Sequence, residues 1–235
     1  MVFAKRSQKP ERIDTGDYTP EEFATFLREI RFINQRLGDR KAIEKTLLFE
    51  ISNLDLRDFS VLDVGAGSGE LLSVIADFAR SSGRTAHLAG LDLNMLSARE
   101  IAAESARHRE ISAIQGDALD LPFADGAFDY AICSLFTHHL TDEQILCLLP
   151  EMSRVARRGI VVIDLERSMI AWMLYQLFCT AYRISPLVRQ DGSLSIRKGF
   201  RVDELRQFAD LAELNDVSVQ RHSPYRVVMF AGPRS

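Results

Sequence analysis

Apolar positions after residue 57 alternate between short continuous runs and longer stretches with helical spacing. The short runs, which favour buried strands, cover 60–65, 85–93, 111–117, 127–136, 159–165, 217–223 and 225–232. In most of the intervening stretches the apolar residues recur every three or four positions, as on one face of a helix. Near-continuous apolar strands separated by helices are typical of a parallel sheet covered on both faces. The pattern therefore predicts an α/β fold with a doubly wound, seven-stranded, mostly parallel sheet.

Two helical patterns precede the first strand and predict an N-terminal helical cap. The first begins at TPEEF, because Thr19 can cap a helix, Pro20 suits its first position and Glu22 completes a capping box. A second helix, RKAIEKTLLFEISNL, follows it directly. Residues 1–17 show no apolar periodicity and are predicted to be disordered or extended.

Residues 166–200 form an insertion between the fifth strand and the next helix. Its first half, MIAWMLYQLFCTAYRI, is more apolar than one amphipathic stripe requires, yet too short to span a membrane comfortably. We expect a lid facing a hydrophobic substrate, a dimer surface or a piece of the core. The second half, 185–200, is polar and is predicted to be a loop. The expected organisation is a tail and cap at 1–57 and a core at 58–235 that carries the insertion.

Composition excludes several classes of function. The chain has 235 residues, 46% of them hydrophobic and 26% charged, which suits one globular α/β domain. A net charge of −4 provides no general attraction to nucleic acid. The three cysteines include no C-x-x-C pair, so neither a disulfide framework nor a zinc site is indicated. The polar N-terminal stretch lacks the apolar segment of a signal peptide, and a cytoplasmic protein is expected.

The sharpest motif is VLDVGAGSGE, which places Gly65, Gly67 and Gly69 between the first strand and a helix. Glycine permits positive φ and lets a ligand lie against the backbone, and a helix N-terminus favours a negative group. The spacing is G-x-G-x-G, whereas a dinucleotide-binding turn has G-x-G-x-x-G. A tight strand-to-helix turn without a ligand is the alternative interpretation.

Acidic residues accompany this turn on three successive strands. Asp63 lies inside the first strand, Asp92 ends the second in GLDLN, and Asp117 ends the third in QGDALDLPF. In such sheets the ligand crevice lies at the carboxyl ends of the strands. A carboxylate after the second strand can bind both hydroxyls of a ribose, and one after the third can accept from an adenine amino group. Helix capping by these aspartates is the alternative interpretation.

These motifs, with FDYAICSLFTHHL and LLPEMSRVARRGIVVIDL, resemble those of the class I S-adenosylmethionine-dependent methyltransferases, in particular the small-molecule group related to quinone-biosynthesis enzymes. The resemblance runs from about Val61 to Leu165. It implies a Rossmann-like sheet, S-adenosylmethionine as cofactor and S-adenosylhomocysteine as product. The cofactor-binding residues that it implies are Asp63, Gly65, Ala66, Gly67, Gly69, Asp92, Leu93, Asp117, Ala118 and Ser134.

The same resemblance gives several of these residues a place along the cofactor. The methionine part would lie against Asp63 and the first two glycines, and Ser134 would lie near the sulfonium. Asp92 would hold the ribose and Leu93 would flank the adenine. Asp117 would meet the edge of the adenine ring.

Two features of the sequence limit which acceptors and which mechanism of methyl transfer are expected. The segment SLFT replaces the Asn/Asp-Pro-Pro-aromatic motif of nucleic-acid amino-methyltransferases, so base amines are not the expected acceptors. None of the five lysines lies near a strand end of the core, which disfavours the lysine, aspartate and divalent-metal arrangement of catechol-type enzymes. We predict metal-independent, in-line O-methylation, or else C-methylation, of a hydrophobic phenol or enol of polyketide or quinone type. The protein is expected to be a monomer or homodimer, without nucleic-acid partners or stable membrane insertion.

His138 and His139 directly follow the fourth strand and are the candidate catalytic residues. Imidazole, with a pKa near 6.5, can take the proton of a phenol or enol; a cofactor-pocket wall and simple packing are the alternatives. Adjacent residues of an extended segment point in opposite directions, and no carboxylate or cysteine nearby in sequence completes a ligand set, so no metal site is expected. His138 is preferred because it is nearer the strand end. The candidate substrate contacts of the insertion are Trp172, Tyr175 and Arg197.

Two other function classes remain open at this stage. A nicotinamide-dependent reductase could use a similar sheet, although the glycine spacing differs and no Tyr-x-x-x-Lys is present. A non-catalytic protein that binds S-adenosylmethionine, or assembles with a partner, would carry the same ligand motifs. Methylation of RNA is a weaker fourth alternative.

Overall fold

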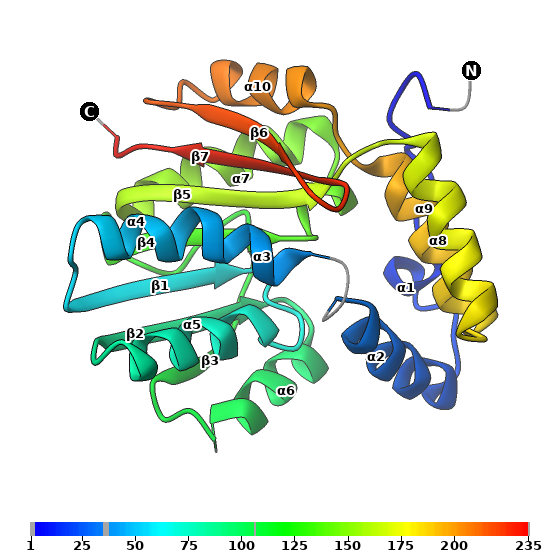
Figure 1. Cartoon of the computed structure of the whole chain (residues 1–235), viewed down its shortest axis with the longest axis horizontal. Helices are drawn as coiled ribbons and strands as arrows, with labels where there is room; N and C mark the ends of the chain where they lie inside the picture. The colour runs from blue at the N-terminus through cyan, green and yellow to red at the C-terminus, as the bar shows by residue number, and fades with distance from the viewer. Residues whose placement is uncertain (1–2, 35–37, 106, 235) are drawn as a thin grey trace.

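A computed structural model describes residues 3–34, 38–105 and 107–234, which fold around one central sheet (Figure 1). The sheet has seven strands in the order β3-β2-β1-β4-β5-β7-β6. β7 runs antiparallel to both of its neighbours, and the pairs among β1 to β5 are parallel. The predicted seven-stranded, mostly parallel sheet is therefore confirmed. The strands are β1 (Asp58–Val64), β2 (Thr85–Asp92), β3 (Ile111–Gln115), β4 (Phe128–Ser134), β5 (Ala156–Leu165), β6 (Ser218–His222) and β7 (Arg226–Ala231).

Helices cover both faces of this sheet, because its central strands are apolar on both sides. In β1, Leu62 and Val64 face one hydrophobic cluster, whereas Phe59 and Val61 face the other. The first cluster is closed by α7 (Asp142–Val155) and α10 (Val202–Leu211). The second is closed by α5 (Glu70–Ser81), by part of α6 (Met95–Ser105) and by a helix that precedes β1. The doubly wound arrangement follows from this two-sided burial.

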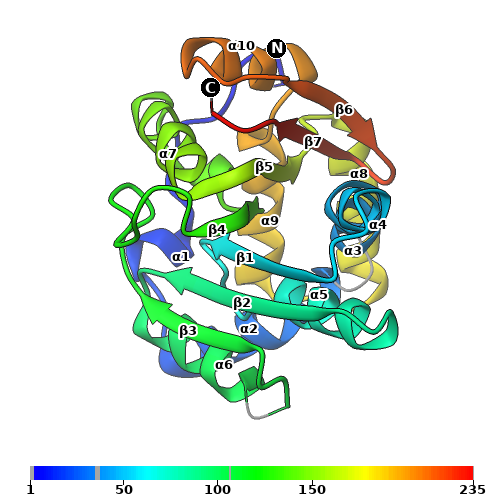
Figure 2. The same cartoon turned by 90° about the vertical axis from the view of Figure 1, so that its left-hand side faces the viewer.

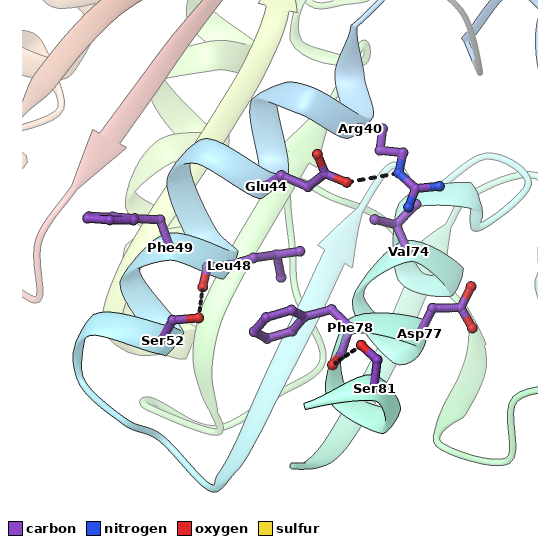
Figure 3. A pocket seen from close by; sticks show the side chains of 9 residues that line it. All are labelled: Arg40, Glu44, Leu48, Phe49, Ser52, Val74, Asp77, Phe78 and Ser81. Carbon is purple, nitrogen blue, oxygen red and sulfur yellow. Dashed lines mark hydrogen bonds and ion pairs between the residues drawn. The ribbon is translucent and has the colours of Figure 1, made fainter. Parts of the chain in front are cut away.

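The helix before β1 is the predicted second helix of the cap, and it is one continuous rod. It consists of α3 (Asp39–Ile43), a π-helical turn (Glu44–Leu48) and α4 (Phe49–Asn53). Its buried residues include Ile43, Leu47 and Ile51, which pack on the sheet. An open groove separates it from the middle and C-terminal half of α5 (Figure 3). None of the predicted site residues lines that groove, and the glycine turn lies at the opposite, N-terminal end of α5.

The remaining N-terminal elements and the insertion gather beyond the carboxyl ends of the parallel strands (Figures 1 and 2). They are α1 (Arg12–Thr15), α2 (Pro20–Asn34), α8 (Met169–Ala181) and α9 (Pro186–Lys198). A third apolar cluster joins them, with Ile33 from α2, Tyr175 from α8 and Val188 from α9. Arg31 of α2 pairs with Glu70, the first residue of α5, at 3.3 Å. These elements therefore sit over the edge where the glycine turn lies.

Two predictions about irregular segments are wrong. Within residues 3–17, α1 forms, and Glu11, just before it, is only 2% exposed, so the segment is neither disordered nor merely extended. Most of the predicted polar loop 185–200 is the helix α9. Its Asp-Gly-Ser sequence suggested a loop, but a side chain at Gly192 would lie 2.1 Å from the Tyr175 hydroxyl of α8. The glycine therefore allows two helices to approach closely.

The insertion exposes much of the apolar surface of α8. Ala171, Tyr175 and Cys179 face inward, whereas six large apolar residues of residues 169–182 are about half exposed or more: Met169, Ile170, Met173, Leu174, Leu177 and Tyr182. No helix in the described ranges is both long and apolar enough to cross a bilayer. α8 covers most of the apolar first half of the insertion, and its role as lid, dimer surface or core stays a prediction.

Helix capping supplies a test of local stability. The predicted capping box of Thr19 with Glu22 forms in α2, and Thr141 with Gln144 forms another in α7. We expect Thr141→Ala to lower the free energy of unfolding by about 1 kcal/mol, because a backbone N–H of α7 loses its acceptor. Urea denaturation measures this difference. Thr180→Ala, an exposed change in α8, is the control, and an equal loss in both variants would contradict the capping explanation.

Candidate active site

The glycine turn between β1 and α5 has the backbone that its sequence predicts. Gly65, Gly67 and Gly69 have φ values of 71°, 55° and 73°, in the region that disfavours other residues. A Cβ on Gly65 would lie 2.4 Å from Cγ of Phe136, so that position is closed by packing. A Cβ on Gly67 would meet no atom within 4 Å in the described part of the chain. The backbone of Gly67 is therefore open to a ligand.

Asp92, at the end of β2, ties this turn to its own loop. Its Oδ2 accepts a hydrogen bond from the backbone N–H of Gly67 at 3.0 Å, and its Oδ1 accepts from that of Asn94 at 2.8 Å. Burial raises the pKa of Asp92, and these backbone hydrogen bonds offset part of that rise. The second predicted acidic residue thus lies directly at the glycine turn.

Asp63 is a buried carboxyl group with an unsatisfied oxygen. Its side chain is 3% exposed, and Oδ1 finds no hydrogen-bond partner among the described residues. Burial, together with the nearby charge of Asp92, raises its pKa to about 8. Native structures rarely leave a buried polar atom unpaired. A ligand that carries an ammonium or other donor group would supply the missing partner, and this fits the methionine part of S-adenosylmethionine.

The other predicted cofactor residues lie at the same edge of the sheet. Register pairs Asp92 with Gln115 of β3, and Asp117 follows two residues later in the loop. Ser134 is the last residue of β4, and β4 pairs with the side of β1 that faces away from β2. Leu93 is 68% exposed, as an apolar wall open to a ligand would be. Ala66 lies within the glycine turn, and Ala118 is buried after β3. The fold brings the residues together on adjacent strand ends; their contacts with a cofactor stay a prediction.

The two histidines form a 3₁₀ turn, Thr137–His139, and not an extended segment. Their ring centroids are 4.3 Å apart and their planes are inclined by 35°. The prediction that they point in opposite directions is therefore wrong, because a 3₁₀ turn carries neighbouring side chains around an axis. The turn begins just after Phe136, whose ring covers Gly65. The histidines are thus separated from the glycine turn only by Phe136, which packs on it.

His138 is buried and held by Asp164 of β5. Nδ1 of His138 lies 2.7 Å from Asp164 Oδ1, and the backbone N–H of His138 donates to Asp164 Oδ2 at 2.9 Å. Asp164 is fully buried, and burial alone would raise its pKa. The charge and hydrogen bonds of His138, with a backbone bond from Leu165, outweigh burial and lower that pKa. An ionised Asp164 accepts a hydrogen bond from Nδ1 of His138, so that nitrogen carries a proton.

His139 lies nearer the surface and pairs with Asp14 of α1, its Nδ1 being 2.9 Å from Asp14 Oδ1. Burial would lower the pKa of His139, but the hydrogen bond to Asp14 and the charges of Glu11 and Asp14 raise it. Lys198 at the end of α9 lies 3.5 Å from Asp14 Oδ2. The expectation that no lysine comes near this end of the core is therefore wrong. The insertion folds back, and contacts of α9 with the histidine turn bring Lys198 there.

Glu11, which sequence analysis did not single out, completes the group. Its Oε1 lies 3.9 Å from His138 Nε2 and 3.4 Å from Lys198 Nζ, and its Oε2 accepts from the Ser195 hydroxyl at 3.0 Å. Glu11, His138 and His139 each offer a potential ligand atom, all within 4.8 Å of one another. No carboxylate among the sequence neighbours completes a ligand set, but the fold brings Glu11 beside the two histidines. That the site takes no metal stays a prediction.

The three candidate substrate residues of the insertion differ in their surroundings. Tyr175 is buried, and its hydroxyl donates to the carbonyl of Val188 at 2.8 Å, so helix packing uses it. Trp172 is half-buried with its ring edge-on to Phe3 at 6.5 Å. Nε of Arg197 is buried without a hydrogen-bond partner in the described ranges. Of the three, Arg197 has an unused polar atom, and Tyr175 lies in a helix contact instead of an open cavity.

The residues that sequence analysis missed differ in how they could have been found. Asp164 ends an apolar strand just as Asp63 and Asp92 do, and the same signal applied to β5 would have identified it. Glu11 carried no such signal, because it lies in a polar stretch without periodicity. It reaches the site because the tail folds back over the sheet edge.

Comparisons with known proteins agree with this geometry. Residues 61–159 match the family described as a methyltransferase domain. Over 160 residues the chain is 33% identical to a demethylmenaquinone methyltransferase of Bacillus licheniformis, with 66% of each protein covered. It is 35% identical over 109 residues to the protein of that name from Bacillus pumilus, covering 46% of this chain and 44% of that one. The chain thus matches from under half to about two thirds of the length of these relatives.

A solved structure shares the fold at low sequence identity. The magnesium protoporphyrin IX methyltransferase of Synechocystis PCC 6803 with bound S-adenosylhomocysteine superimposes with a TM-score of 0.57, at 14% identity, over 84% of each chain. At this identity the likeness shows the shared fold alone.

Proposed function

Because this chain belongs to the class I S-adenosylmethionine-dependent methyltransferases, we propose that it methylates an oxygen of a hydrophobic small molecule, a phenol or enol. The proposal rests on one observation: the glycine turn, where the methyl donor would bind, lies beside an imidazole whose orientation is fixed. Phe136 packs on Gly65 of the glycine turn, and two residues later His138 is oriented by Asp164. A methyl donor and a proton acceptor are the two groups that such a transfer needs.

The donor side is assigned to residues that fit the cofactor. Asp63 and Gly67 would hold the methionine part, Asp92 the ribose, and Leu93 with Asp117 the adenine. When bound, S-adenosylmethionine supplies a methyl group on a sulfonium, which is already activated for displacement. The protein therefore has mainly to align the acceptor with that methyl and exclude water. Such positioning is worth roughly 7–11 kcal/mol of the barrier.

The acceptor side is assigned to His138. With Nδ1 protonated and held by Asp164, Nε2 takes the proton of the acceptor hydroxyl as the oxygen attacks. General-base assistance of this kind contributes about 10²–10⁴-fold to the rate. Asp164 stabilises the imidazolium that results, since it is ionised and hydrogen-bonded to the ring.

Two observations support a hydrophobic acceptor. The relatives from Bacillus are named for a demethylated menaquinone, so a quinone-like ring is a fitting class of acceptor. The insertion places apolar and aromatic residues, Trp172 among them, over the carboxyl edge of the sheet. Methylation at a ring carbon is the alternative that these relatives favour. Carbon-13 NMR of the product, which separates O-methyl from C-methyl signals, decides between the two.

The cellular location and the oligomeric state are proposed from fewer observations. The three cysteines, all in the described part of the chain, form no disulfide, which fits a reducing cytoplasm. The exposed apolar face of α8 makes a homodimer the alternative to a monomer. Light scattering of the purified protein measures its oligomeric state.

Calorimetry and turnover test the proposed function. We expect S-adenosylhomocysteine to bind with micromolar affinity and NADPH not to bind, because Asp63 and the G-x-G-x-G turn suit the former. Methyl transfer from labelled S-adenosylmethionine is then assayed on a panel of phenols, enols and hydroxyquinones. Binding of NADPH alone would indicate a reductase. Binding of S-adenosylhomocysteine without transfer to any acceptor of the panel would indicate a non-catalytic binding protein.

A further inference from the structure

The N-terminal segment Phe3–Asp17 covers the two histidines and is held by polar contacts. Arg6 pairs with Asp142 at 2.8 Å and donates to the carbonyl of Lys198 at 3.1 Å. The carboxylate of Asp191 in α9 accepts the backbone N–H groups of Arg12 and Ile13, each at 3.0 Å. Phe3 also packs edge-on against Trp172, and the Arg6 guanidinium lies over the ring of Phe200 at 4.2 Å. The segment therefore closes over the site through contacts at its two ends and with α9.

Glu11 is the residue of this segment that meets the imidazole of His138. Both side chains are almost completely buried, at 2% and 3% exposed, so an acceptor reaches them only when the segment opens. The distance of 3.9 Å between Glu11 Oε1 and His138 Nε2 is too long for a hydrogen bond. Oε1 has no hydrogen-bond partner within the described ranges, although Lys198 Nζ lies 3.4 Å away. A buried carboxylate oxygen is thus aimed at the basic nitrogen without using it.

We propose that Glu11 is a positioning residue of the methyl transfer. Residues 3–17 form a cover over the acceptor site, and this cover brings Glu11 to His138. This inference rests on the proposed function, with His138 as the base. In the closed state the imidazole lies between two carboxylates, Asp164 at Nδ1 and Glu11 near Nε2.

The step balances in atoms and charge. The acceptor O–H proton moves to His138 Nε2, the oxygen forms a bond to the methyl carbon, and the sulfur–methyl bond breaks with its electron pair left on sulfur. The sulfonium becomes a neutral thioether, and the positive charge resides on the imidazolium. Glu11 and Asp164 stabilise that imidazolium from its two sides. The proton leaves when the cover opens and water reaches the ring.

The charges around His138 come from four elements. Asp164 faces it from β5, Glu11 from the cover, Lys198 from α9 through Glu11, and the His139–Asp14 pair lies beside it. Loss of the negative charge of Glu11 makes the imidazolium that forms during the transfer less stable, so kcat falls. The affinity for S-adenosylhomocysteine, which would bind at the glycine turn, does not change.

Glu11→Gln tests this inference, with Glu21→Gln, an exposed carboxylate at the start of α2, as the matched control. For Glu11→Gln we expect a kcat reduced about tenfold and unchanged affinity for S-adenosylhomocysteine. The control keeps the wild-type kinetic profile. An unchanged kcat in a folded Glu11→Gln protein, whether KM changes or not, would overturn the inference.

Two further measurements keep the result interpretable. In a His138→Gln background, Glu11→Gln should cause no additional loss of kcat, because Glu11 acts through His138; an additive loss contradicts this. Loss of wild-type activity on treatment with EDTA, restored by Co²⁺ in the wild type but not in Glu11→Gln, would make Glu11 a metal ligand and overturn the inference. If wild type transfers methyl groups and the kcat of Glu11→Gln is unchanged, only the inference fails; if wild type transfers none, the proposed function fails.

Discussion

Replacing His138 by glutamine should lower kcat by about 10²–10⁴-fold and leave the affinity for S-adenosylhomocysteine within about twofold. The substitution removes the proton acceptor, while the glycine turn, Asp63 and Asp92 keep their geometry. The backbone N–H groups of residue 138 and Leu165 still donate to Asp164, so the buried carboxylate is not left unpaired. Single-turnover kinetics with labelled cofactor measure the rate, and calorimetry measures the affinity.

Two other histidines control this experiment. His87 is exposed on β2 and pairs weakly with Asp58 at 3.4 Å, at the amino-terminal ends of the strands, so His87→Gln should leave kcat unchanged. His139→Gln should act mainly on the contact with Asp14, and hence on closure of the N-terminal segment. If His139→Gln abolishes turnover and His138→Gln does not, the base is His139. If neither does, a histidine base is excluded.

Binding of S-adenosylhomocysteine at pH 7 should release close to one proton, and this is the second large effect. Asp63 in the free protein has its pKa raised to about 8, so at pH 7 the carboxyl is mostly protonated. An ammonium group of the ligand favours the carboxylate and lowers that pKa. Affinity should therefore rise as pH increases from 6 to 8 and then level off. Calorimetry in phosphate and in Tris, which differ in ionisation enthalpy, counts the protons.

Asp63→Asn should separate binding from stability. Because the pKa of Asp63 is raised on folding from its ordinary 3.8, this group lowers wild-type stability progressively as pH rises from about 4 to about 8. The variant lacks this dependence and should unfold at higher denaturant concentration at pH 7, by on the order of 2 kcal/mol. Its affinity for S-adenosylhomocysteine should fall, and binding should release no proton. Equal stability of the two proteins across this pH range would contradict the assignment.

Much of the donor side was predictable because its signals are local. The short apolar runs set the strands, and Gly65, Gly67 and Gly69 set the turn by their φ angles. Aspartates at the ends of parallel strands meet at one edge whatever the details of packing, so the places of Asp63 and Asp92 followed from strand order alone. The capping box at Thr141 is equally local.

The acceptor side was not predictable in the same way, because it is assembled from distant segments. The direction of the two histidines depends on a 3₁₀ turn, which the apolar residues before it do not signal. The Asp-Gly-Ser sequence predicts a loop where α9 forms. Its glycine is present because Tyr175 of α8 packs too closely for a side chain at that position. Lys198 reaches the cluster only because α9 folds back.

The sheet, the glycine turn and the row of aspartates could be predicted from local patterns, because hydrophobic period, backbone φ and strand ends are properties of neighbouring residues. The surroundings of His138 depend on tertiary packing. Glu11, Asp164 and Lys198 lie far apart along the chain, and their charges meet because the N-terminal segment and the insertion both fold over the same edge of the sheet. No single segment encodes the burial of those charges. Their burial around the imidazole makes His138 a candidate base.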